Sequence, residues 1–202
     1  MQKNEISNDS REVILEHVDE RVTLTPAEKY LFISLLTETS FPRKTAILSP
    51  GEICKHQSFV VKGCLKIFHL DNDGNEHTAK FAVENWWAFD IESFFQSAPA
   101  FYGITSLEQT TVLQLSQEHH KELLDTIPAF ERFYRLMLQQ SFIALQHRMT
   151  QSLAHTAEIR YVRFREKYPG LENRISQREI ASYLGITPVF LSMIRKQELT
   201  KH

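Results

Sequence analysis

The sequence of 202 residues has little cysteine and no long apolar segment. Cys54 and Cys64 match neither a disulfide framework nor a zinc-binding spacing, which favours a reducing compartment. The polar segment 1–10 lacks the apolar centre of a signal peptide, and no apolar run approaches the roughly 18 residues that a membrane-spanning helix needs. We therefore expect a cytoplasmic protein.

Signatures of catalysis are also missing. Six scattered glycines form no phosphate-binding loop, and there is no Gly-x-Ser-x-Gly nucleophile motif. The segments 54–56 and 118–120 contain histidine but no second pair of ligands at a metal-binding spacing. Two cysteines cannot supply the usual four ligands of an iron–sulfur cluster, and heme held by one of the nine histidines stays open without a motif to favour it. The sequence predicts a protein that is not an enzyme and needs no metal or cofactor.

Charge is unevenly distributed along the chain. Residues 158–202 hold nine Lys or Arg and five Asp or Glu, a net charge of +4. Residues 1–157 hold fourteen and twenty, a net charge of −6. A basic C-terminal segment on an acidic body is typical of a protein that binds a polyanion, although a solvated surface gives the same pattern.

Residues 41–116 consist of short β-type runs separated by turns. The strongest turn is Asp71-Asn72-Asp73-Gly74-Asn75, because these residue types tolerate positive φ. Such spacing favours a barrel or jelly roll over a parallel sheet. Before it, the capping box at Thr25–Glu28 predicts a helix that continues to the break at 40–42.

A helical period without Gly or Pro runs from about Ala129 to His155. One apolar stripe would pack this helix onto its own domain, and a second stripe needs another partner, for which a twofold copy is the simplest choice. The alternative is a buried core helix, but a length near 40 Å, at ~1.5 Å per residue, exceeds what one small domain usually buries. The residues predicted at the dimer interface are Phe130, Tyr134, Met137, Ser141, Leu145 and Met149.

The C-terminal segment carries the most specific local pattern. Ser176-Gln177-Arg178-Glu179 indicates a capping box that opens a helix over Gln177–Leu184. Gly185 permits a tight turn, and Thr187-Pro188 starts a second helix with Leu191 and Ile194 facing inward. Together these features predict a helix-turn-helix, with a plain helical hairpin as the alternative. A helix-turn-helix presents the N-terminal half of its second helix to a DNA major groove.

From about Thr25 to its end, the chain resembles the Crp/Fnr regulators. The resemblance rests on Ile175–Pro188 and on Pro50–Cys54 and Phe59–Gly63, which are similar to the start of that family's cyclic-nucleotide-binding-type barrel. It implies an α+β fold: a double-stranded β-helix (jelly-roll) sensor domain at 1–127, a long dimerisation helix at 128–155 and a small helical helix-turn-helix domain at 156–202. It also implies a homodimer that binds DNA and contacts RNA polymerase.

The region similar to the family's phosphate-binding segment departs from the family pattern. Phe89 and Asp90 stand where cyclic-nucleotide binders have Gly and Glu, and residues 81–120 contain no Lys or Arg. Burying a cyclic phosphate there without a cation would be costly, so we expect neither cyclic AMP nor cyclic GMP to bind. The aromatic residues of this region form either a pocket for a small apolar ligand or the filling of the barrel and its lid. The pocket candidates are Phe81, Trp87, Phe89, Asp90, Ile91, Glu92 and Phe101.

The second helix of the C-terminal pair departs as well, because Val189 and Met193 replace the Glu and Arg of the pattern Thr-Pro-Glu-x-Leu-Ser-Arg. These apolar side chains can touch thymine methyl groups but cannot form bidentate hydrogen bonds with bases, which predicts weak or A·T-leaning sequence choice. Basic residues, including Lys201, remain for phosphates, and the end of the sequence at His202 leaves no room for a β-hairpin wing. The predicted DNA-binding residues are Ser176, Gln177, Arg178, Thr187, Pro188, Val189, Phe190, Ser192, Met193, Arg195 and Lys196.

The sequence therefore predicts a DNA-binding transcription regulator that does not respond to cyclic nucleotides. A degenerate regulator is the rival interpretation. In that case the exposed Phe190 and Met193 would contact a protein partner, with weak or no specific DNA binding.

Overall fold

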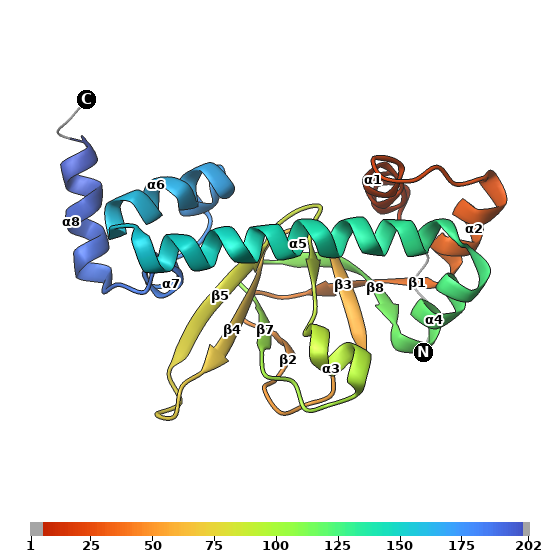
Figure 1. The fold of residues 1–202 in the computed structure, drawn as a ribbon, viewed down its shortest axis with the longest axis horizontal. Helices are drawn as coiled ribbons and strands as arrows, with labels where there is room; N and C mark the ends of the chain where they lie inside the picture. The colour runs from red at the N-terminus through yellow and green to blue at the C-terminus, as the bar shows by residue number, and fades with distance from the viewer. Residues whose placement is uncertain (1–5, 200–202) are drawn as a thin grey trace.

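The computed structural model describes residues 6–199. Two four-stranded antiparallel sheets lie at its centre, with strand orders β1-β8-β3-β6 and β2-β7-β4-β5 (Figure 1). The strands are β1 (Leu36–Phe41), β2 (Ala46–Leu48), β3 (His56–Lys62), β4 (Leu65–Leu70), β5 (Glu76–Ala82), β6 (Trp87–Ala88), β7 (Gly103–Ser106) and β8 (Thr110–Ser116).

Helices flank the sheets at both ends, and one long helix, α5, crosses over them and joins the two groups (Figure 1). No helix in the described range is both long and apolar enough to span a bilayer. The helices are α1 (Asn8–Asp19), α2 (Pro26–Ser34), α3 (Ile91–Gln96), α4 (Gln117–Thr126), α5 (Ala129–Ala154), α6 (Ala157–Lys167), the short 3-10 helix η1 (Leu171–Asn173), α7 (Gln177–Leu184) and α8 (Pro188–Leu199).

The predicted β-rich domain and long helix are confirmed, but the end of α2 is not where we expected it. Thr25 and Glu28 form the predicted capping box. The helix nevertheless ends at Ser34, and residues 36–41 form β1, which pairs along its whole length with β8. Alternation of β-branched residues such as Thr37 and Thr39 suits this edge strand better than a further helical turn.

The first half of α5 belongs to the core of its own chain. Phe130, Tyr134 and Met137 are buried in the main hydrophobic cluster, and the Tyr134 hydroxyl donates to Gln57 Oε1 at 2.9 Å. The prediction that these three residues form a dimer interface is therefore wrong. An apolar stripe of this period can pack on the chain's own core or on a second copy of the helix. In the first half of α5 it packs on the core of its own chain.

The second half of α5 is different, because residues 6–199 leave its apolar side chains exposed. Leu145 is 62% exposed and Met149 64% exposed, while Phe142 beside the exposed Ser141 is also open. From Phe142 to Met149 these side chains cover about two turns of the helix, which is unusual for a surface that faces only water.

The C-terminal helices pack around a second core that includes part of the barrel. Ile180, Leu184, Leu191 and Ile194 fill its helical side, and Phe81 of β5 fills the barrel side. The C-terminal helices are therefore seated against the β4–β5 edge of the second sheet rather than held apart from it.

Candidate functional site

The helix pair α7–α8 is built from local signals in the sequence. Ser176 Oγ accepts a hydrogen bond from Glu179 N at 3.3 Å, which caps α7. Gly185 ends α7 in the left-handed conformation, at φ 66°, where a side chain would be strained. Thr187 Oγ1 then accepts from Phe190 N at 3.1 Å and caps α8. The bounds predicted for α7 agree with the structure.

The N-terminal half of α8 presents an apolar surface to solvent. Val189 is 72% exposed and Met193 49% exposed, and Phe190 is partly exposed. Leu191 and Ile194 are buried on the opposite face, as the spacing predicted. The Ser192 hydroxyl already has hydrogen-bond partners within the chain. It donates to Gln177 Oε1 and to the carbonyl oxygen of Pro188, both at 3.1 Å.

Most of the other predicted DNA-binding residues are exposed as well. Arg195 is only half exposed, and Lys201 lies outside the described residues. The exposed members are Ser176, Gln177, Arg178, Thr187, Pro188 and Lys196. The contact between Ser192 and Gln177 joins the two helices, and a common DNA-binding surface for the whole set stays a prediction.

Glu179 does not complete the predicted capping box at α7. Its carboxylate instead pairs with Lys66 of β4, at 3.1 Å between Oε2 and Nζ. Lys66 also pairs with Glu76 at 2.6 Å, and its side chain is only 6% exposed. Nearby, Thr78 N donates to Ser182 Oγ at 3.0 Å. These contacts fix α7 to the β4–β5 hairpin.

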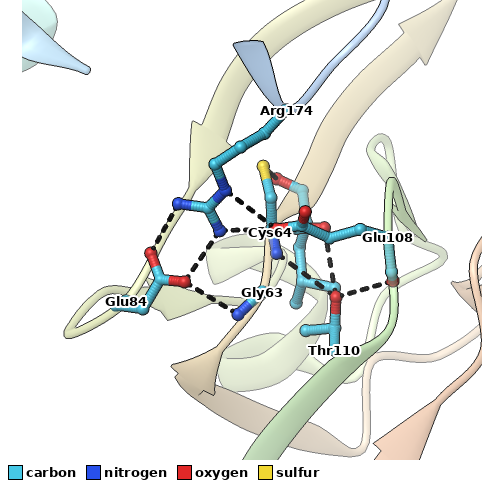
Figure 2. A network of polar contacts seen from close by, with 7 residues as sticks. Gly63, Cys64, Glu84, Glu108, Thr110 and Arg174 are labelled. Atoms are coloured by element: carbon cyan, nitrogen blue, oxygen red, sulfur yellow. Dashed lines mark hydrogen bonds and ion pairs between the residues drawn. The ribbon is translucent and has the colours of Figure 1, made fainter. Parts of the chain in front are cut away.

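A second ionic contact lies at the other side of the same seam between barrel and helices. The Arg174 guanidinium, just before α7, donates to the carboxylates of Glu84 and Glu108, and Glu84 also accepts from Gly63 N at 2.9 Å (Figure 2). Burial disfavours the charge of Glu84, but the hydrogen bonds from Arg174 and Gly63 outweigh it and hold the pKa of this carboxyl below its ordinary value. The same two carboxylates raise the pKa of Arg174.

Helix α5 reaches this seam through Arg148. Its Nη2 donates to the carbonyl oxygens of Thr78 and Tyr183, at 3.3 and 3.1 Å, and the guanidinium lies 4.0 Å from the centroid of the Tyr183 ring. Arg148 therefore touches the barrel and α7 at once. Sequence analysis missed Lys66, Arg148 and Arg174, because single basic residues far apart in the chain carry no local signal.

Asp90 has a structural role. It is 3% exposed, and its Oδ1 accepts from Ser93 N at 2.9 Å, which caps α3. Its Oδ2 accepts from Phe101 N and Tyr102 N, at 3.0 and 2.9 Å. The carboxylate thus ties α3 to the start of β7 and is already saturated with donors.

The predicted pocket residues do not line one common cavity. Phe81 lies in the C-terminal core, while Trp87 packs on Phe59 and Phe89 packs on Phe94. The remaining three candidates, Ile91, Glu92 and Phe101, face solvent. The prediction that these residues line a ligand pocket is therefore wrong. The alternative, in which the aromatic rings fill the barrel and its rim, agrees with the structure.

A cavity does open elsewhere in the barrel, at the end where β2 passes into β3. Its volume is about 530 Å³, and it is lined from both sheets by Leu48 and Ile104 on one side and Ser58 and Gln114 on the other. No feature of the sequence pointed to it.

Comparison with known proteins places this architecture in a class. Residues 38–127 match the family model of the cyclic nucleotide-binding domain. The β-sandwich and long helix match the fold of Crp/Fnr-type regulators. A comparison with curated protein sequences finds no match.

Three solved structures illustrate the likeness. CLP of Xanthomonas campestris, described as a c-di-GMP-responsive global regulator, is 15% identical with a TM-score of 0.70, over 88% of this chain and 93% of that one. FixK2 of Bradyrhizobium japonicum is 17% identical with a TM-score of 0.72, over 82% and 85%. A CooA variant of Carboxydothermus hydrogenoformans is 18% identical with a TM-score of 0.68, over 90% and 87%. At these identities the likeness concerns the fold.

Proposed function

We propose that the chain is a homodimeric, DNA-binding transcription regulator of the Crp/Fnr type. The observation that carries the proposal is the pair α7–α8, in which two capped helices meet at Gly185 and leave Val189, Phe190 and Met193 exposed. This is the arrangement of a helix-turn-helix, whose second helix enters a major groove.

The proposal divides the chain into a sensor domain at 1–127, a dimerisation helix at 128–155 and a DNA-binding domain at 156–202. The exposed apolar half of α5 around Leu145 and Met149 supports pairing with a second copy. By analogy with the class, RNA polymerase is a further partner and the cytoplasm is the compartment.

The sensor domain of this regulator does not bind cyclic nucleotides. Asp90 stands in the segment similar to the family's phosphate site, and its carboxylate is already bound by three backbone N–H groups. A cyclic phosphate placed there would meet a carboxylate instead of a cation, which is unfavourable in a buried site.

Binding to native genomic fragments across a salt series tests the DNA-binding function. Phosphate contacts release counterions, so affinity should fall steeply, by roughly 10³-fold or more between low and physiological salt if about six phosphates are contacted. Arg178→Ala should lower the salt slope by about one unit. Lys121→Ala is the control, because it removes an equal charge from α4 at the opposite end of the molecule (Figure 1).

A second function fits the same surface. The exposed Phe190 and Met193 would also suit contact with a protein partner. Binding that is absent, or that barely responds to salt and to Arg178→Ala, would contradict the DNA-binding proposal and favour this alternative.

A further inference from the structure

The cavity of about 530 Å³ lies between the two sheets and is unlike the aromatic-filled region around Phe89. Its apolar wall comes from the second sheet, where Leu48 of β2 pairs with Ile104 of β7. Both side chains are buried. The size falls in the range of small-molecule sites, which is about 300–1,000 Å³.

The facing wall is polar, which is unusual inside a sandwich. Gln114 of β8 pairs with Ser58 of β3, and its Nε2 donates to Ser58 Oγ at 3.3 Å. Gln114 Oε1 accepts from Thr39 Oγ1 at 3.1 Å. Ser58 is buried, and its own hydroxyl hydrogen has no acceptor among residues 6–199. The Ser58 hydroxyl is therefore a donor that a ligand in the cavity could use.

The mouth of the cavity carries one cation, Lys55, and one anion, Glu52, so its formal charges cancel. Lys55 is exposed there, and His56 follows it at the start of β3. Burial, and then the charges of Lys55 and His119, lower the pKa of His56, so the imidazole is neutral at pH 7 and can donate a single hydrogen bond. Glu52 also lies at the mouth, with its carboxylate accepting from Ser49 N at 2.8 Å.

We propose that this cavity binds a small organic carboxylate, with its hydrocarbon part against Leu48 and Ile104 and its anionic group at Lys55 and His56. The Glu52 carboxylate is held by Ser49 N, and no ion pair among residues 6–199 joins it to Lys55, so the Lys55 ammonium is available to a single negative charge. A phosphate dianion usually requires several charged donors or a helix N-terminus. Sites for small amphipathic molecules usually combine a mostly apolar wall with a few polar groups at fixed positions, as this cavity does.

The cavity has a direct connection to the segment that Asp90 organises. Cys54 N, in the cavity wall, donates to Ser93 Oγ of α3 at 2.8 Å, and Ser93 N donates to Asp90. Ile53 forms an isolated β-bridge with Pro99, just after α3. An occupant would therefore order the loop 51–55 and, through it, α3.

Calorimetry with decanoate as the probe tests the proposal on the full chain, and decanol is the matched neutral probe. Decanoate should bind at least tenfold more tightly than decanol. Lys55→Glu should weaken decanoate at least tenfold and leave decanol within twofold. Lys62→Glu is the control, because it makes the same charge change at the far end of β3, and it should leave both affinities within twofold.

Thermal melting of each variant checks that folding is unchanged, which is expected because Lys55 is exposed. Equal affinity for the two probes, an unchanged decanoate affinity in Lys55→Glu, or absence of decanoate binding up to millimolar concentration would each overturn the proposal. The experiment contains no DNA, so its failure is separate from failure of the regulator function.

Discussion

Glu179 and Lys66 join the first helix of the C-terminal pair to the barrel, with Oε2 and Nζ 3.1 Å apart. Lys66 is nearly buried and has Glu76 as its second partner, so one ammonium holds two carboxylates that would otherwise repel each other. Lys66 is therefore the cation that balances the charge of both carboxylates where α7 meets the β4–β5 hairpin.

Lys66→Ala should loosen α7 from the hairpin. Two carboxylates would stay at the seam without a cation, but both are partly exposed, so we expect a loss of about 1–2 kcal/mol. Hydrogen exchange should become faster in α7 and β5 while β3 and β8 stay protected, and urea titration should show the lower free energy of unfolding. Lys29→Ala is the control, because its pair with Asp19 is exposed, and it should cost under ~1 kcal/mol. Equal losses in the two variants would mean that Lys66 does not hold the seam.

Arg174→Ala should reduce stability in a way that depends on pH. Arg174 keeps the pKa of Glu84 below its ordinary value, so Glu84 contributes stability above that value and loses it as the pH falls through its lower, folded pKa. At neutral pH the variant should lose about 1–2 kcal/mol, an amount limited because the side chain is a third exposed. The difference from the unsubstituted protein should shrink when the pH falls below 4.5.

Arg174→Lys provides the control for this pH effect. Lysine keeps the charge but cannot reproduce the forked contact with Glu84 and Glu108, so we expect only partial recovery. Urea titrations at a series of pH values measure both variants. A loss that stays constant with pH would show that packing of Arg174, not its ion pairs, stabilises the seam.

Leu145→Glu combined with Met149→Glu should convert the proposed dimer into monomers. Both side chains are exposed in the single chain, so charges there cost little unless a second copy buries them. Sedimentation velocity measures the change in mass. Tyr30→Glu, on a large residue of α2 that is 80% exposed, should leave the proposed dimer intact. Persistence of dimers in the double variant would place the interface on another surface.

Cyclic AMP and cyclic GMP should give no heat of binding in calorimetry at neutral pH. Asp90→Ala should not create such binding, because it removes three hydrogen bonds rather than supplying a cation. It should instead lower the free energy of unfolding by about 2 kcal/mol or more, since three backbone donors lose their acceptor. Clear nucleotide binding that Asp90→Ala abolishes would contradict our interpretation of this segment.

The ends of helices in this chain could be predicted from its sequence. Which distant residues pack against each helix could not. The ends of α7 follow from Ser176 and Gly185, whose effects act within a few residues. The period of α5 identified the helix but not what covers it, because a sheet and a second helix bury the same stripe. Tyr134 illustrates this, since its hydroxyl partner, Gln57, lies on a distant strand.

The candidate site shows the same limit. Glu179 is correctly spaced for a capping box, but its carboxylate pairs with Lys66 of β4 instead of with the backbone. The cavity depends on Ser58 and Gln114, which are far apart in the sequence and meet only when β3 pairs with β8. Neither residue is unusual by itself, so no pattern along the chain could indicate their joint effect.

The two ends of α5 have different anchors: Phe130 in the barrel core and Arg148 against Thr78 and Tyr183. A straight helix of 26 residues is a stiff lever, roughly 39 Å long at 1.5 Å per residue. A tilt of about 5° at the Phe130 end would move the other end by roughly 3 Å over that length. Displacements of this size exceed the tolerance of a hydrogen bond, so a movement too small to disturb the barrel would break the carbonyl contacts of Arg148. A small tilt at one end of α5 would thus become a larger displacement at the other.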